Sequence, residues 1–376
     1  MKFVVSSAEL LSHLQAISKV INNKNTLPIL DNFLFKVEGS TLEITASDLE
    51  TTMVTRVSLI SSSDDGAIAI PAKFMTEYLG KFSDQPLTFE ISTENFSILI
   101  NSAAGKSNII GYDWEDFPLL PDLKQDRVST LLVSAELALH GIGKTIFATG
   151  EDELRPVMNG IFIELSTENI TFVASDSHKL VRYRRSDVQA NNDGCFILPK
   201  KPAGLLRTIL AKEQGNVEIS FDDKNAMFKL HEYTMVSRLV EGVYPNYSSV
   251  IPTNNTNRLV IDRVEFLGSL RRVSMFTSQS TNLIKMELRE NQLAIFAQDI
   301  DFSIAGDETL PCQYDGDSMN IGFKANNLID ILANLSSTDI CIEISDPTRA
   351  CLVLPVQIDI EGEDVLMLIM PLIVND

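Results

Sequence analysis

Apolar residues near the start of the chain recur at the spacing of an amphipathic helix. The apolar stripe contains Leu10, Leu11, Leu14, Ile17 and Ile21, and the opposite side carries Ser12, Gln15 and Lys19. Such a stripe predicts a helix that buries one face and leaves the other in water. The next apolar runs, FLFKV and LEITA, alternate in polarity on either side of Glu38-Gly39-Ser40, which predicts an antiparallel hairpin with one buried face.

This pattern of helix and hairpin returns twice along the chain. AELLSHLQAISKVI around Leu10 is followed by AELALHGIGKTIF around Leu137 and by the more divergent VEFLGSLRRVSMF around Phe266. In each copy the hairpin closes on an aspartate, at Asp48, Asp176 and Asp299, and a short strand then leads into a second helix and further strands. Self-similarity at a nearly fixed period indicates a triplicated structural unit.

The third copy keeps the helical stripe despite its divergence. Its apolar positions are Phe266, Leu267, Leu270 and Val273, and its expected polar positions are Ser269, Arg271 and Arg272. The sequence therefore predicts an α+β protein of three repeated domains, each with two helices packed on antiparallel sheets. We place the domains at residues 1–120, 128–250 and 257–376, joined by linkers rich in turn formers at 118–127 and 251–257.

Composition sets the broad class of the protein. With 44% hydrophobic and 22% charged residues, the 376-residue chain can bury several cores and is typical of a globular protein. The N-terminus lacks the apolar core of a signal peptide and no apolar run is long enough to span a membrane, so we expect a cytoplasmic protein. The four cysteines form no CxxC pair, which argues against a zinc site or a disulfide framework.

Candidate catalytic groups are weak. A hydrolase could use Asp48, Asp176 and Asp299, but separate domains would hold these carboxylates too far apart for paired acid and base work, and turn capping is the simpler explanation. His178 in Ser-Asp-Ser-His has no oxyanion loop beside it, and the GKT at 143–145 lacks the spacing of a phosphate loop. We therefore predict no enzymatic activity and no cofactor or metal.

Motifs in all three copies resemble the bacterial beta sliding clamp family. They are the opening MKFVVSSAELL, the segment TLPIL at 26–30, Asn159-Gly160 with SDSHKL at 175–180, RLVEGVYPNY at 238–247, and Met370-Pro371-Leu372. The resemblance implies a head-to-tail homodimer whose six units form a ring, with helices around a central hole and sheet outside. It also implies a processivity factor that encircles double-stranded DNA without sequence preference and tethers the replicative polymerase, the clamp loader and other proteins that carry a clamp-binding motif.

A net charge of −20 disfavours contact with DNA unless basic residues gather where the duplex passes. The predicted DNA-binding residues, on or beside the expected helices, are Lys24, Lys73, Lys81, Lys144, Lys200, Lys201, Arg207, Arg271 and Arg272. Lys19, Lys212 and Lys324 are further candidates of the same kind. Lys24 matches a basic loop position that contacts DNA in the family, whereas Pro156 and Val157 replace the paired tyrosines of its second domain. The alternative is that these are ordinary solvated side chains.

The resemblance also implies a peptide-binding cleft between the second and third domains. Its lining would be Met158, Ser175, Ser177, His178, Lys179, Leu180, Pro245, Ser249, Val250, Ile369, Met370 and Leu372. Lys179 and Ser249 stand where many relatives carry arginine, and the chain extends past the usual end with Asn375-Asp376. The alternative to a peptide-binding role for the segment VLMLIMPLIV is that it forms a core strand.

Ring closure would join the first domain of one copy to the third of the next, through Ser107 on one side and Met275 and Phe276 on the other. Ser107 falls where relatives place an aromatic residue. Met275 and Phe276 could instead belong to the core of their own domain. A different class of function, a multidomain peptide-binding scaffold that does not encircle DNA, remains open at this point.

Overall fold

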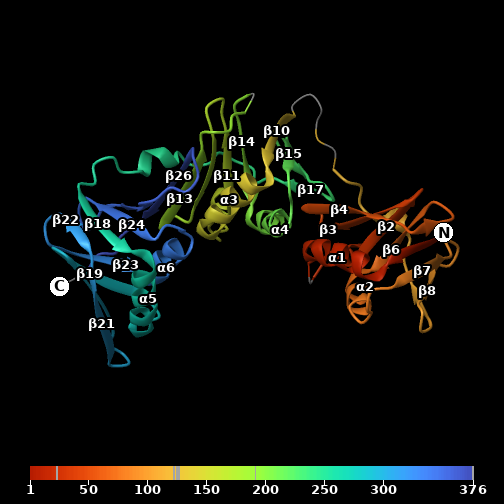
Figure 1. Ribbon diagram of the computed structural model, residues 1–376, viewed down its shortest axis with the longest axis horizontal. Helices are drawn as coiled ribbons and strands as arrows, with labels where there is room; N and C mark the ends of the chain where they lie inside the picture. Colours follow the sequence, from red (N-terminus) through yellow and green to blue (C-terminus); the bar gives the residue numbers. More distant parts are fainter. Residues whose placement is uncertain (23, 122, 124–127, 191, 375–376) are drawn as a thin grey trace. The chain divides into compact units, whose positions relative to one another are not determined.

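The computed structural model describes residues 1–22, 24–121, 123, 128–190 and 192–374. The predicted linker at 118–127 lies partly outside the described residues, and the C-terminal Asn375-Asp376 lies wholly outside them. The chain divides into two compact units, one formed by Met1–Leu139 with Lys201–Leu239 and the other by His140–Lys200 with Val240–Asp376. Figure 1 traces the elements of each unit.

Three copies of one order of elements follow each other along the chain. The first contains β1 (Lys2–Ser6), α1 (Ser7–Ile17), β2 (Asn32–Glu38), β3 (Thr41–Ser47), β4 (Thr51–Ser58), β5 (Ser61–Ser62), β6 (Gly66–Pro71), α2 (Ala72–Leu79), β7 (Pro86–Ile91), β8 (Ser97–Asn101) and β9 (Lys106–Ile110). The second contains β10 (Ser129–Ser134), α3 (Ala135–Thr145), β11 (Gly160–Leu165), β12 (Ile170–Ser175), β13 (Lys179–Arg185), β14 (Gly194–Pro199), α4 (Lys200–Leu210), β15 (Asn216–Phe221), β16 (Asn225–Lys229) and β17 (Tyr233–Arg238). The third contains β18 (Asn257–Asp262), α5 (Arg263–Val273), β19 (Leu283–Arg289), β20 (Gln292–Asp299), β21 (Ile304–Pro311), β22 (Gln313–Asp315), β23 (Met319–Lys324), α6 (Ala325–Ala333), β24 (Asp339–Ile344), β25 (Cys351–Pro355) and β26 (Glu363–Ile369). The predicted triplication and the α+β class are confirmed.

The helices bury the stripes that the sequence predicts, with two corrections. In α1 the buried residues include Leu10, Leu14 and Ile17, but Leu11 is half-buried, and Ile21 lies beyond the short 3-10 helix η1 (Ser18–Val20) that follows. The sequence places Ser269 on the polar side of α5, yet it is fully buried, and its hydroxyl is satisfied by donating a 2.6 Å hydrogen bond to Glu308 Oε2 on β21. Helices α1 and α2 pack side by side, as do α5 and α6 (Figure 1).

Two sheets run from one sequence copy into the next. An eight-stranded sheet has the order β10-β15-β16-β17-β4-β3-β2-β6, and a nine-stranded sheet has the order β14-β11-β12-β13-β26-β25-β24-β18-β22. The connecting pairs are β4 with β17 and β13 with β26, both antiparallel. We call these pairs the first and second joints. Because strands of successive copies pair at these joints, each compact unit extends across a predicted domain boundary. The exact positions of the boundaries stay predictions.

The two remaining sheets end on strands with one unpaired edge. They have the orders β5-β1-β7-β8-β9 and β21-β20-β19-β23, so β9 and β21 are edge strands. Their side chains are partly or fully exposed along the whole length of each strand, in contrast to the largely buried β4, β13, β17 and β26. An edge strand presents unpaired N–H and C=O groups that can pair with another chain.

The glycine of the GKT-like segment has a packing role. Gly141 lies inside α3, and a Cβ atom at this position would come within 2.5 Å of the Phe172 ring on β12. The glycine therefore permits close approach of helix and sheet, and the segment is helical, as predicted, without a phosphate loop.

The described part of the chain contains neither a membrane-spanning helix nor a cluster of metal ligands. No helix there is long and apolar enough to cross a membrane, and no group of three or more His, Cys, Asp or Glu side chains could hold a metal ion. Cys195, Cys312, Cys341 and Cys351 are free thiols, the last two buried. The predicted cytoplasmic location stays a prediction.

Candidate functional site

Three equivalent aspartates cap the turns that close their hairpins. Asp48 Oδ1 accepts hydrogen bonds from the N–H groups of Glu50 and Thr51, at 3.0 and 2.7 Å. Asp176 Oδ1 accepts from the next turn at 2.9 and 2.8 Å, and Asp299 Oδ1 accepts from its own turn at 3.0 and 3.3 Å. The predicted turn-capping role is confirmed, because each carboxylate satisfies backbone donors that the turn leaves free.

An ammonium group connects the first of these turns to helix α4 of the second copy. Lys201, in the first turn of α4, donates to Asp48 Oδ2 at 2.5 Å, to Asn22 Oδ1 at 2.6 Å and to the Val20 carbonyl at 2.8 Å. These contacts use all three donors of the ammonium. We call them the joint latch, because they lie at the first joint. Lys73 takes the equivalent place in α2, second in the helix after a strand that ends in proline.

The second turn is tied to its neighbouring helix in a similar way. Lys179 is buried, and its Nζ lies 2.9 Å from Asp176 Oδ2, 3.3 Å from Asn327 Oδ1 and 3.6 Å from Asp330 Oδ2. Burial acts to raise the pKa of Asp176, but hydrogen bonds from the Lys179 ammonium and from the backbone N–H groups of Lys179 and His178 outweigh it, so the pKa is lowered. The predicted peptide-contacting Lys179 thus directs its charge toward α6.

The C-terminal segment runs alongside this turn. The Met370 N–H donates to the His178 carbonyl at 2.8 Å, and the Leu372 N–H donates to the Gly322 carbonyl at 2.8 Å. A side chain on Gly322 would collide with Val374 and Leu283, so the glycine allows the segment to lie against β23. The structure therefore holds Met370 next to the turn at 175–179, as the predicted cleft requires.

Residues at this surface differ in their accessibility. The exposed ones are Ser177, His178, Pro245, Ser249, Val250 and Met370, and we call them the candidate peptide surface. Leu372 is half-buried, while Met158, Ser175, Lys179, Leu180 and Ile369 are buried. Ile369 has no exposed area and pairs with Lys179 and Cys351 in the sheet. It therefore belongs to a core strand, which is the alternative that the sequence left open for this segment.

An apolar cluster supports the candidate peptide surface from below. Leu180 packs in it with Tyr244 and Tyr247, and the half-buried Phe162 stacks on Tyr244 with ring centroids 4.8 Å apart. Burial raises the pKa of the Tyr244 hydroxyl, which keeps it neutral. Sequence reasoning missed these three aromatic residues, although the aromatic pair flanking Pro245 in VYPNY was a usable signal.

The turn at Ser177 brings in Arg155, a residue that the sequence did not point to. Ser177 has a φ of +77°, a conformation that a serine adopts only when its surroundings hold it. Its hydroxyl lies 2.5 Å from Arg155 Nη1 and 3.6 Å from Met158 Sδ. Arg155 in turn pairs with Asp152 at 2.8 Å. These contacts hold the exposed turn of the candidate peptide surface in one conformation.

The predicted DNA-binding residues fall into two groups. Lys24, Lys73, Lys81, Arg207 and Arg271 are exposed and form no ion pair among the described residues. Lys144, Lys200, Lys201 and Arg272 each lie near a carboxylate, at 3.8, 2.6, 2.5 and 2.6 Å respectively. Arg272 and Ser269 lower the pKa of Glu308 to about 2. The second group is therefore partly neutralised within the chain.

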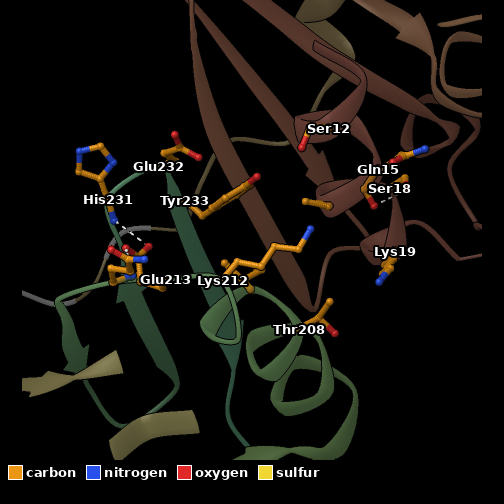
Figure 2. A pocket seen from close by; sticks show the side chains of 13 residues that line it. Ser12, Gln15, Ser18, Lys19, Thr208, Lys212, Glu213, His231, Glu232 and Tyr233 are labelled. Atoms are coloured by element: carbon orange, nitrogen blue, oxygen red, sulfur yellow. Dashed lines mark hydrogen bonds between the residues drawn. The ribbon is translucent and has the colours of Figure 1, made fainter. Parts of the chain in front are cut away.

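A cavity of about 800 Å³ lies where α1 approaches α4 and the start of β17. Its lining is mostly polar and includes Lys19 and Lys212, two of the further candidates for DNA binding. Figure 2 shows the Lys212 side chain directed from the turn after α4 toward α1, with Tyr233 above it. His231 donates its backbone N–H to Glu213 at 3.3 Å on the rim. Two cations and two glutamates line this cavity, so it has no dominant charge.

The predicted interface residues lie on edge strand β9 and on the 3-10 helix next to edge strand β21. Met275, on the 3-10 helix η7 (Ser274–Phe276), is 77% exposed, so it does not belong to the core of its own domain. Phe276 is half-buried against Gly306 of β21. Ser107 on β9 is half-buried and its hydroxyl accepts a 2.7 Å hydrogen bond from Tyr78 on α2.

Models of one protein family match almost the whole chain. They are the N-terminal, central and C-terminal domains of the DNA polymerase III beta subunit, at residues 1–121, 133–246 and 248–372. A beta sliding clamp of Proteus mirabilis is 28% identical over 348 residues, covering 92% of this chain and 94% of that protein. One of Pseudomonas putida is 26% identical over 353 residues, covering 94% and 95%.

A solved structure shares the fold over the full length. The sliding clamp of Pseudomonas aeruginosa, in complex with griselimycin, superposes with a TM-score of 0.93 at 24% identity and covers 100% of both chains. The fold of this chain is therefore the three-domain clamp fold.

Proposed function

The chain belongs to the DNA polymerase III beta subunit family, and from that premise we propose that it is a DNA sliding clamp whose two copies close head to tail into a ring around duplex DNA. In this role it holds the replicative polymerase on its template. Retention comes from the closed ring, so strong binding to DNA is unnecessary.

The two joints carry the proposal of ring closure. Within one chain the sheet of each copy continues into the next through an antiparallel pair, β4 with β17 and then β13 with β26. The strands that would form a third such pair, β21 and β9, are the exposed edges of their sheets. Pairing β21 of one copy with β9 of a second copy, and the reverse, satisfies both edges in both copies. A heterologous contact of this kind closes a ring when the rotation per unit allows it.

Passage of DNA requires weak contacts that ignore sequence. Lys24, Arg207 and Arg271 are exposed and without ion-pair partners among the described residues, so they can neutralise phosphates as the duplex moves. The net charge of −20 then keeps other surfaces from binding nucleic acid. We propose no bond chemistry for the protein, because its three recurring carboxylates are occupied in separate turns.

Tethering of partners would use the candidate peptide surface. Met370 and Val250 offer exposed apolar area beside a floor of aromatic side chains, and a flexible methionine can adapt to different partner residues. The proposed ligand is a short peptide segment of the polymerase, of the clamp loader or of another protein that carries a clamp-binding motif.

Ring topology can be tested separately from DNA affinity. Size-exclusion chromatography with light scattering should give a dimer, and a clamp loaded onto nicked circular plasmid should stay bound until a restriction enzyme linearises the circle. A scaffold that does not encircle DNA would dissociate equally from both forms, and this result would refute the proposal.

Truncation tests the tethering site. Removing residues 370–376 should abolish binding of a fluorescent polymerase-derived peptide in an anisotropy assay, because the surface loses Met370 and the strand contact with Gly322. Light scattering should still show a dimer, since Leu372 bridges to β23, at the opposite edge of the sheet from β21. Unchanged peptide affinity would show that the peptide binds elsewhere.

The apolar side of the interface has its own test. Met275→Asp should weaken the dimer, because it places a carboxylate where the proposed interface excludes water. Val264→Asp is a matched control, since Val264 is 60% exposed at the other end of α5. Equal dimer affinities of the two variants would contradict the proposed position of the interface.

A further inference from the structure

The first joint has a defined register that can be followed across the sheet. Met53 of β4 pairs with Ala46, two residues before the turn aspartate, and faces Met235 of β17 across the joint. Met235 in turn pairs with Phe228, and this line of partners ends at Leu131, four residues before α3 begins. Both methionines are fully buried.

The second joint repeats this register at the same structural positions. Val181 of β13 pairs with Ala174, again two residues before the turn aspartate, and faces Met367 of β26. Met367 pairs with Val353, and the line ends at Leu259, four residues before α5 begins. Two independent joints thus agree on which residues meet, which indicates that the register is a property of the repeated unit.

The same positions can be located on the two free edges. On β21 the partner of Ala297, two residues before Asp299, is Gly306. On β9 the line that starts at Phe3, four residues before α1, passes through Phe89 and Ile100 and ends at Ser107. Gly306 and Ser107 are therefore the equivalents of the paired residues in both joints.

Helix side chains fill the space that these two small residues leave. Phe276 lies over Gly306 so closely that a Cβ atom there would collide with its ring, and Tyr78 holds Ser107 through its hydroxyl. Aromatic rings from η7 and α2 thus stand where the joints have buried methionine and valine side chains from the strands themselves.

The next pair of residues supplies complementary charge. If β21 and β9 pair antiparallel with Gly306 opposite Ser107, the next residue on β21, Asp307, stands opposite the preceding residue on β9, Lys106. Both side chains are exposed, and neither forms an ion pair within the described part of the chain. Opposite charges directly across an antiparallel pair stabilise it, whereas a shift of register by one residue would remove the match.

We infer that the ring seam repeats the register of the two joints, with Gly306 of one copy opposite Ser107 of the second copy and Asp307 opposite Lys106. This inference rests on the proposed ring and adds the residue pairs that close it. Tyr78 and Phe276 then meet across the seam beneath the paired strands. The partner is a second copy of this chain.

Cysteine cross-linking tests the register. Directly opposed residues in an antiparallel pair have Cα atoms about 4.5–5.5 Å apart, within the range of a disulfide, whereas residues displaced by two positions lie beyond it. In a background of Cys195→Ser and Cys312→Ser, Lys106→Cys with Asp307→Cys should give a covalent dimer when treated with diamide. The matched control combines Lys106→Cys with Thr309→Cys and should remain uncross-linked.

The outcomes separate the register from the ring. Linkage of 106 to 307, identified by mass spectrometry of the joined peptides, supports the inference. A chain that is dimeric by light scattering but links 106 to 309, or links neither pair, overturns the register and leaves the ring. A monomer overturns both.

Charge reversal gives a second, independent readout. Lys106→Asp or Asp307→Lys alone should weaken dimerisation about fivefold, because like charges then face each other. The double variant should restore most of the affinity. Failure of the double variant to recover, with intact folding by circular dichroism, would also overturn the register.

Discussion

Lys179 provides the most direct test of how the candidate peptide surface is held. Its side chain is 8% exposed, and its ammonium lies 2.9 Å from Asp176 and 3.6 Å from Asp330. Lys179→Met keeps most of the apolar contacts of the side chain but removes the charge. Asp176 then loses its cation while its other oxygen still accepts the two backbone hydrogen bonds of the turn.

The expected cost follows from the burial of the partners. Breaking a fully buried ion pair costs about 3–5 kcal/mol. Here the Asp176 and Asp330 side chains keep 21% and 48% of their exposure, so water screens part of the loss, and we expect about 1–3 kcal/mol of local stability to disappear. Hydrogen exchange of residues 175–181 should accelerate by roughly 5- to 150-fold.

The pH dependence has a definite sign. The pKa of Asp176 is lowered in the folded protein, so its stabilising contribution is present above the unfolded pKa near 4 and is lost as pH falls through the folded value. The difference between the wild-type protein and Lys179→Met should therefore be largest at neutral pH and vanish in acid. Lys179→Arg, which keeps the charge, is the matched control.

A clear result would refute this reasoning. If Lys179→Met changed local exchange at pH 7 by less than about twofold, the ammonium would contribute nothing measurable to the turn. If peptide affinity fell while exchange stayed constant, Lys179 would act by touching the peptide itself, as the sequence alone suggested.

Two further predictions concern packing and the subunit seam. Gly141→Ala should lower the free energy of unfolding by about 1–3 kcal/mol in urea denaturation, because its Cβ would meet the Phe172 ring, and an unchanged midpoint would show that the helix can shift. Lys73 is the counterpart in α2 of Lys201 in the joint latch, so its ammonium is expected to contact Asp299 of the second copy. Lys73→Glu should weaken the dimer because this contact is lost. Lys81→Glu, which changes the charge by the same amount, is the control. Equal dimer dissociation constants of these two variants, measured by light scattering, would contradict a role of Lys73 at the seam and leave it as a predicted DNA-binding residue.

The amino-acid sequence determined the local elements and their repetition. The apolar stripe through Leu10, Leu14 and Ile17 required a helix with one buried face, and the hairpin around Gly39, whose φ is +58°, required a tight turn. The capping aspartates were predictable for the same reason, since a carboxylate satisfies turn donors within a few residues of itself. Such signals are local, so periodicity and spacing suffice to find them.

Tertiary structure decided what each charged or small residue does. Lys201, Lys179 and Ser269 are polar residues that the sequence assigned to exposed roles, yet each contacts a carboxylate distant in the chain, on Asp48, Asp330 and Glu308 respectively. Nothing in their neighbouring residues encodes those partners, because the contacts exist only once the chain has folded: the Ser269–Glu308 contact within the third copy, and the other two between successive copies. The joints also define the register that locates Gly306 and Ser107 on the free edges of β21 and β9. Long-range strand pairing brings these groups together, and for that reason the fold could be predicted from periodicity while the detailed roles at the joints could not.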